Sequence, residues 1–483
     1  MTADITDAEA LRAETGLDAV APRARLLSVS QIVRRLFRMA LLFLAARMLG
    51  VETFGKYALL LTVVEMIALL SGVGYIDFLT REVAKRPSVA WSLGARITTL
   101  RLAYIIPGVG LALLVLTALR FPGALVLNAA LMAITLVPRA AGETAQGVLR
   151  GLRRFAPLPW IELVQGGIVL AAAGLVLHFG FGLRGMIAAE VLSAGAGAAA
   201  ALASVARTEG DAAEDAPGFR DLVRSTLAFN VYPFIVNVYD RVDVVLLAKL
   251  VGNAATGIYA LPYRAYGTLS IIPYGVMGAL LPAFSASRVD QNSRDACARA
   301  MMFLYLVALL IVLATLTFAG PLVSLLLGES YAGSIQTIKI LIWACPPVFL
   351  NFALSTLLLA AHKEKIFLVT ALIGTAFNIT ANLLLIPRYS FLAAAAVTVA
   401  TESLLLAVFL YFVKKFLGQA VFPQKGIRIT VGFVVVMTAY WLLARQIPQI
   451  WAGSAACLVF GLLAARTASG MRVIKALVRS GAR

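Results

Sequence analysis

Charged residues are scarce in this sequence. Only 14% of its 483 residues are Asp, Glu, Lys or Arg, and 61% are hydrophobic, whereas charged residues make up about 25% of an ordinary soluble domain. The mean hydropathy is +0.90. Such a chain has too few polar residues to cover a water-exposed surface, which excludes a soluble globular enzyme.

The residue types that build metal centres and disulfides are equally few. Cys297, Cys345 and Cys457 are the three cysteines, and they lie within or beside apolar stretches without the spacing of a metal site. The two histidines, His178 and His362, stand alone in the sequence. We therefore expect small buried cysteines, no cofactor or metal ion, and no enzymatic activity.

Long apolar runs dominate instead. A helix needs about 20 apolar residues to cross the hydrocarbon layer, and such runs follow one another from Leu26 to Ala465. They are continuous blocks, which favours helices over the alternating strands of a barrel. The sequence thus predicts an all-α integral membrane protein with about 14 transmembrane helices. Their expected limits are 26–48, 56–79, 91–118, 123–149, 158–179, 184–206, 220–250, 256–285, 298–327, 335–361, 365–386, 391–413, 427–446 and 449–467.

The basic residues between these runs alternate between two sides. The N-terminus and every second loop, including the loop with Arg150, hold 26 Lys and Arg residues, and the opposite loops hold seven. Cytoplasmic loops of membrane proteins collect basic residues. The distribution predicts that both termini are cytoplasmic. It also explains the net charge of +18 without a nucleic-acid partner.

Two parts of the sequence resemble each other. Residues 50–59 and 252–261 share five identities, and both follow the first span of a group of six. A weaker similarity relates residues 181–185 to 389–393. Because six is an even number, both groups begin on one side of the membrane, so the repeat is parallel and substrate is expected between the halves.

The predicted organisation is an N-terminal cytoplasmic extension (1–25), an N-lobe of six helices (26–206), an acidic cytoplasmic linker (207–219), a C-lobe of six helices (220–416), and two extra helices with a basic tail (417–483).

Several short motifs resemble the bacterial oligosaccharide-lipid flippases, the polysaccharide export family. This family shares a superfamily with the lipid II flippases and the multidrug and toxin exporters. The motifs are Leu49-Gly50 with Phe54-Gly55-Lys56-Tyr57, Gly72-Val73-Gly74, Asp243 with Val251-Gly252 and Gly257-Ile258-Tyr259-Ala260, Pro282, Leu327-Gly328-Glu329-Ser330-Tyr331, and Asn378 with Asn382 through Tyr389.

The resemblance implies a transporter of the bacterial inner membrane. Its substrate would be a polyprenyl-pyrophosphate-linked glycan, carried by alternating access from the cytoplasmic to the outer leaflet of the lipid bilayer. H⁺ or Na⁺ would be the coupling ion, and a glycan polymerase or glycosyltransferases would be candidate partners. The first, second, seventh and eighth spans would line the central cavity.

Nine arginines fall inside the expected spans, where each costs about 2.5–3.5 kcal/mol at a helix centre. We expect Arg47, Arg96 and Arg101 to reach the membrane surface by snorkelling. Arginine binds phosphate oxygens bidentately, and tyrosine can stack on sugar rings. The predicted substrate-binding residues are therefore Arg34, Arg38, Arg241 and Arg264, with Arg139, Tyr259 and Tyr263 as secondary candidates.

Acidic residues within the spans have two interpretations. A buried carboxylate can titrate near neutral pH, so Glu65, Asp240 and Asp243 are candidates for ion coupling. The alternative is that they neutralise arginines. Arg241 lies between two of them, and Arg139 precedes Glu143 by four residues, which places each pair within reach.

Three other functions remain as alternatives. A lipid II-type flippase would need the same cationic cavity, whereas a cation-coupled multidrug exporter should have an apolar or acidic one. A membrane polymerase or glycosyltransferase would carry its catalytic groups on large outer loops, and the loops expected here are short.

Overall fold

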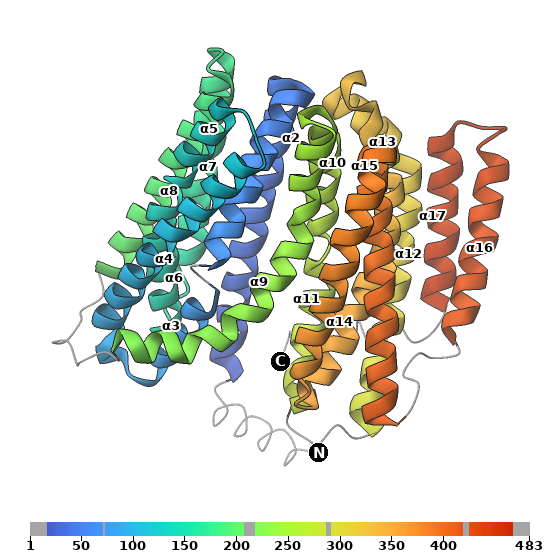
Figure 1. Ribbon diagram of the computed structural model, residues 1–483. Helices are drawn as coiled ribbons and strands as arrows, with labels where there is room; N and C mark the ends of the chain where they lie inside the picture. The colour runs from blue at the N-terminus through green and yellow to red at the C-terminus, as the bar shows by residue number, and fades with distance from the viewer. Residues whose placement is uncertain (1–16, 71–72, 207–217, 286–290, 419–424, 467–483) are drawn as a thin grey trace. The chain divides into compact units, whose positions relative to one another are not determined.

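The computed structural model describes residues 17–70, 73–206, 218–285, 291–418 and 425–466. Within these ranges all regular structure is helical, which confirms the all-α fold (Figure 1). Most of the N-terminal extension, the linker and the C-terminal tail lie outside the described residues. The helices are α2 Leu17–Leu70, α3 Val73–Lys85, α4 Ala90–Ala118, α5 Gly123–Ala133, α6 Leu136–Gly151, α7 Pro157–His178, α8 Gly182–Ala206, α9 Phe219–Leu250, α10 Asn253–Thr268, α11 Ile271–Ser285, α12 Gln291–Leu327, α13 Ala332–Leu341, α14 Cys345–Ala360, α15 Lys365–Leu417, α16 Lys425–Leu443 and α17 Gln449–Arg466.

Each expected span corresponds to one helix, half of a kinked helix, or consecutive helical segments. The first span lies in the first half of α2, which breaks at Gly50, and the second span covers the second half of α2 and part of α3. The eleventh and twelfth spans form α15, which breaks at Ser390. Among the described residues, seven helices are long and apolar enough to cross a membrane, and an eighth passes if the bent pair Val29–Leu69 and Gly74–Lys85 counts as one span.

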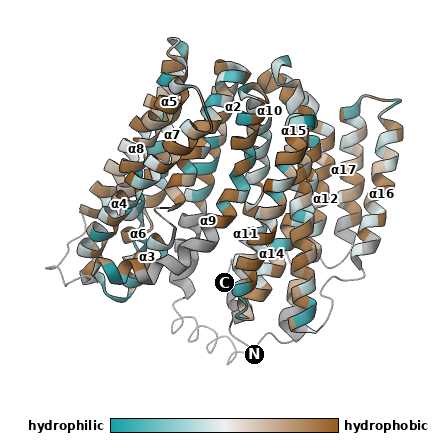
Figure 2. Cartoon of the chain, viewed as in Figure 1, coloured by the Kyte–Doolittle hydropathy of each residue, from teal (hydrophilic) through white to brown (hydrophobic). Residues whose placement is uncertain are grey.

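Apolar residues cover most of the length of the helices (Figure 2). Many of them are exposed, including Ile106 at 74% and Leu325 at 76%. A soluble protein rarely exposes continuous apolar surface, because each buried CH₂ group contributes about 0.8 kcal/mol when it leaves water. Here the exposed surface matches a lipid environment, so the chain is a multi-pass membrane protein.

The chain forms two compact units that divide after Arg241, inside α9. In the first unit, α7 packs against α2 and α8, and α6 packs against α3 and α8. Helices α6 and α8 approach closely because Gly142 has no side chain: an added Cβ would lie 3.0 Å from the Cα atom of Ala198. The expected division into lobes 26–206 and 220–416 remains a prediction.

The second unit is built around α12. This helix packs against α13, α14 and α17, and α14 also contacts α15. Its core contains fully buried residues such as Met301, Leu313 and Leu354. The trailing helix α17 approaches α12 at Gly453, where a Cβ would overlap the side chain of Thr317.

The backbone supports the internal repeat beyond the two sequence similarities. Positive φ angles recur at matching places in the two groups of six spans, and several of these residues are not glycine. Non-glycine residues adopt positive φ infrequently, so recurrence at four matched positions is a specific structural similarity. The matched pairs are Gly50 with Gly252, Arg120 with Gly328, Arg153 with His362, and Gly182 with Ser390.

Candidate functional site

A polar cavity of about 530 Å³ lies inside the first unit. Residues of α2, α3, α5, α6, α7 and α8, and of the turn between α5 and α6, form its walls. Charged groups are costly at membrane depth and mark functional sites there. Five arginines and four glutamates line this cavity: Arg34, Arg35, Arg38, Arg139, Arg150, Glu65, Glu143, Glu162 and Glu190.

Helix periodicity brings the two predicted arginines of the first span to this cavity. Arg34 and Arg38 are four residues apart on α2 and therefore share one helix face. Glutamates from the neighbouring helices face them: Glu162 comes from α7 and Glu190 from α8. The structure thus places Arg34, Arg38 and Arg139 together with Glu65 around one cavity, within one unit of the chain.

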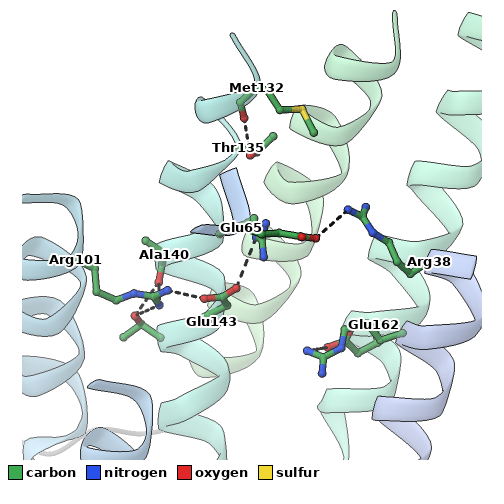
Figure 3. A network of polar contacts seen from close by, with 11 residues as sticks. Arg38, Glu65, Arg101, Met132, Thr135, Ala140, Glu143 and Glu162 are labelled. Carbon is green, nitrogen blue, oxygen red and sulfur yellow. Dashed lines mark hydrogen bonds and ion pairs between the residues drawn. The ribbon is translucent and has the colours of Figure 1, made fainter. Parts of the chain in front are cut away.

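Arg38 is held between two carboxylates. Its Nη1 donates a 2.6 Å hydrogen bond to Glu190 Oε1, and its Nη2 lies 3.7 Å from Glu65 Oε1. Figure 3 shows its guanidinium group pointing toward Glu65. The hydroxyl of Tyr57 also donates to Glu190, at 2.5 Å. Arg241 donates a hydrogen bond to the other oxygen of Glu65. Glu65 therefore neutralises arginines, as one of the two interpretations expected, and Arg241 has a partner besides its sequence neighbours.

Arg101 corrects one expectation. It does not snorkel to the membrane surface: its side chain is only 2% exposed. Its guanidinium group donates to Glu143 at 2.5 Å, to the carbonyl oxygen of Ala140 at 3.0 Å and to the hydroxyl of Thr144 at 3.3 Å (Figure 3). These acceptors on α6 replace the water that snorkelling would provide. The predicted pair Arg139–Glu143 is present too, with 3.6 Å between Nε and Oε1.

Arg34 and Arg150 have weaker contacts with carboxylates than Arg38 and Arg101 have. Among the described residues, the nearest carboxylate to Arg34 is that of Glu162, with 3.9 Å between Nη1 and Oε1, and the side chain of Arg34 is 54% exposed. Its Nη2 donates to the amide oxygen of Gln31 at 3.1 Å. Arg150 was expected in a cytoplasmic loop, but it occupies the last turn of α6 and lines the cavity. Its Nε is buried and has no hydrogen-bond acceptor among the described residues.

Several other predicted residues belong to the second unit and are not among the residues that line this cavity. Asp243 is 1% exposed and accepts a hydrogen bond from the hydroxyl of Tyr259, which also lies 3.3 Å from Thr398. Tyr259 is part of a hydrophobic core, and Tyr263 stacks on it with 5.3 Å between ring centroids. Arg264 follows on the same helix, α10, and is partly buried.

Asp240 and Arg241 belong to α9, at the end of the first unit. Asp240 is partly buried. Neither residue lines the cavity, although Arg241 reaches its wall through Glu65. The structure therefore brings together about half of the predicted site residues.

A family model described as "Polysaccharide biosynthesis protein" matches residues 23–288, which is more than half of the chain. The chain belongs to this family. A second model, MatE, matches residues 231–384. No curated protein sequence matches the chain.

Solved structures show the fold of this polysaccharide biosynthesis family member. The lipid II flippase MurJ in an inward closed conformation aligns with a TM-score of 0.71 at 13% identity, over 92% of this chain and 99% of that one. An inward-facing multidrug resistance MATE family transporter of the MOP superfamily aligns with a TM-score of 0.66 at 13% identity, over 81% and 98%. A MOP superfamily transporter from Pyrococcus furiosus, described as having a binding pocket of reverse polarity, aligns with a TM-score of 0.57 at 14% identity, over 82% of this chain and 94% of that one.

Proposed function

We propose that this protein is a flippase that carries a polyprenyl-pyrophosphate-linked oligosaccharide across the bacterial inner membrane by alternating access, from the cytoplasmic to the outer leaflet. The observation that carries the proposal is the arginine-lined cavity in a member of the polysaccharide biosynthesis family. Oligosaccharides linked to this lipid would serve the synthesis of cell-surface or exported polysaccharide. A glycan polymerase and glycosyltransferases would be functional partners.

The composition of the cavity suits an anionic, hydroxyl-rich headgroup. Its five arginines exceed its four glutamates by one charge. Guanidinium groups bind phosphate oxygens through two parallel hydrogen bonds, and the carboxylates can accept hydrogen bonds from sugar hydroxyls. Arg34, Arg38 and Arg139 are the predicted ligands inside the cavity, and Arg241, Arg264, Tyr259 and Tyr263 remain proposed ligands for other stages of transport.

A lipid II-type flippase is the second candidate function. The alignment with the lipid II flippase MurJ extends over 92% of the chain, and lipid II carries the same pyrophosphate linkage. A multidrug exporter is less consistent with the cavity, because a cationic drug would meet an excess of arginine. Glu65, Asp240 and Asp243 are the proposed groups for coupling to H⁺ or Na⁺.

Transport by the purified protein tests the proposal directly. The full chain would be reconstituted into liposomes with a fluorescent polyprenyl-pyrophosphate oligosaccharide, and translocation would be followed by quenching from an impermeant reductant. The reductant quenches only the lipid in the outer leaflet of the liposome, so fluorescence from the inner leaflet is lost as the lipid is translocated. We expect this loss to be faster with the protein than in protein-free liposomes. Lipid II would be assayed in parallel. Transport of lipid II alone would replace the proposal with the second candidate, and transport of a cationic dye alone would refute both.

A further inference from the structure

The arginines of the cavity differ in how completely their hydrogen bonds are satisfied. Arg38 donates to the carboxylate of Glu190 at 2.6 Å. Arg34 donates to the neutral amide oxygen of Gln31, and its contact with the carboxylate of Glu162 is long, at 3.9 Å. The buried Nε of Arg150 has no acceptor among the described residues. A buried donor without a partner costs about 1–3 kcal/mol, so a ligand that brought an acceptor to Arg150 would be stabilised at this wall.

The two loosely held arginines act on the same carboxylate. Arg34 and Arg150 are the cations that act electrostatically on Glu162, and Arg34 also acts on Arg150. Asp77 and Glu143 are the remaining charged groups that act on Arg150. Glu162 is 8% exposed on its side chain and belongs to α7, whereas Arg34 belongs to α2 and Arg150 to α6. Three helices therefore hold two cations around one buried anion.

We propose that Arg34 and Arg150 form the subsite for the diphosphate group of the substrate, and that Glu162 competes with that group for the two arginines. The inference rests on the proposed function and deepens it. Arg38 is not assigned to this subsite, because the carboxylates of Glu65 and Glu190 already contact its guanidinium group. A diphosphate would complete the hydrogen bonds of Arg34 and Arg150, because charge-assisted bonds from two guanidinium groups can reach oxygens of both phosphates.

Glu162 acts on the two arginines both before and after a diphosphate binds. In the absence of ligand, its carboxylate partly neutralises two cations whose mutual repulsion would otherwise destabilise the wall. When a diphosphate binds, the same carboxylate repels it. Competition with Glu162 would therefore weaken the binding of the headgroup and favour its release during transport.

Binding to the purified full-length protein in nanodiscs tests the assignment. The probes are farnesyl pyrophosphate and inorganic pyrophosphate, measured by microscale thermophoresis. We expect R34Q and R150Q each to weaken the binding of both probes roughly tenfold or more, since a hydrogen bond to a charged group contributes about 1.5–3 kcal/mol. The affinity of R150K for both probes should lie between that of R150Q and that of the unmodified protein. The matched control is R154Q, which removes the same charge from an exposed residue outside the cavity and should change affinity less than twofold.

The variant E162Q separates a ligand-binding role from a structural one. Removal of the competing charge should tighten binding of both probes several-fold, whereas damage to the fold would weaken it. Monodisperse elution and unchanged thermal stability of R150K guard against misfolding. An R150Q protein that binds within twofold of the unmodified protein, or an R154Q protein that loses as much as R150Q, overturns the subsite.

The binding and transport assays together distinguish the failure of this inference from the failure of the proposed function. If the unmodified protein transports the lipid-linked oligosaccharide but R150Q binds normally, only the subsite is wrong. If inorganic pyrophosphate binds as tightly as farnesyl pyrophosphate, and R34Q and R150Q weaken both, the subsite stands but the lipid substrate does not. If the unmodified protein binds neither probe, both are refuted.

Discussion

The buried arginine of α4 offers the sharpest test of how this membrane fold is held together. We predict that R101M, which keeps the length of the side chain but removes its charge, lowers the free energy of unfolding by about 2–3 kcal/mol. The estimate begins with the charge-assisted hydrogen bond to Glu143, which contributes about 1.5–3 kcal/mol. Loss of one partner of a fully buried pair costs about 3–5 kcal/mol.

Two features of the structure place the predicted loss of stability below the range for a fully buried pair. The side chain of Glu143 is 41% exposed and keeps Arg139 at 3.6 Å, so its charge is not left without compensation. The hydroxyl of Thr144 also keeps its own 2.7 Å hydrogen bond to the carbonyl of Ala140. Removal of Arg101 therefore sacrifices mainly a single strong bond.

The assay is equilibrium unfolding in mixed micelles with an increasing fraction of denaturing detergent, followed by circular dichroism. R139M is the matched control. Arg139 is the other cation next to Glu143, and the side chain of Arg139 is 34% exposed, so its replacement should lower the free energy of unfolding by less than about 1 kcal/mol. The double variant R101M/E143Q should lose less stability than R101M and E143Q do in sum, because the two single variants remove the same hydrogen bond. Equal stabilities of R101M, R139M and the unmodified protein would refute the reasoning.

Three further predictions concern packing and topology. Gly453→Ala should detach α17 from α12 and cost about 1–3 kcal/mol, because its Cβ would lie 1.9 Å from a neighbouring side-chain atom, whereas Gly461→Ala has open space and should be neutral in the same unfolding assay; equal effects would contradict the packing. Tyr259→Phe removes the hydrogen bond to a buried aspartate and should lower stability by about 1–3 kcal/mol, so an unchanged unfolding midpoint would show that the hydroxyl contributes nothing. A cysteine at Arg184 should react with an impermeant thiol reagent added to intact cells and one at Lys363 should not; the reverse pattern would invert the predicted topology.

The fold was largely predictable because its main signal is physical and extends over the whole chain. Apolar runs of sufficient length located the helices, including the kinked pairs on either side of Gly50 and Ser390. The repeat was visible at residues 50–59 and 252–261 because those turns need particular backbone angles. Elsewhere the two groups of spans share backbone conformation without sharing residues, which sequence alone does not reveal.

The candidate site was less predictable because its contacts join residues that are distant in the sequence. Spacing indicated that Arg34 and Arg38 share a face and that Arg139 meets Glu143. No periodicity could indicate that Arg38 meets a carboxylate 152 residues further along the chain. Arg150 was missed because it lies beyond an apolar run, although its helix continues through Gly151.

The long sequence separation within the ion-pair network bears on how the protein enters the membrane during synthesis. The first half of α2 carries Arg34, Arg35 and Arg38, and insertion of each into the bilayer costs about 2.5–3.5 kcal/mol at the helix centre. The carboxylates that neutralise this half belong to Glu65, Glu162 and Glu190. When the ribosome has made only α2, most of that compensation does not yet exist. We therefore expect the first helix to reach its final depth only after α8 has been synthesised, so that the helices of this membrane protein would insert cooperatively and not one after another.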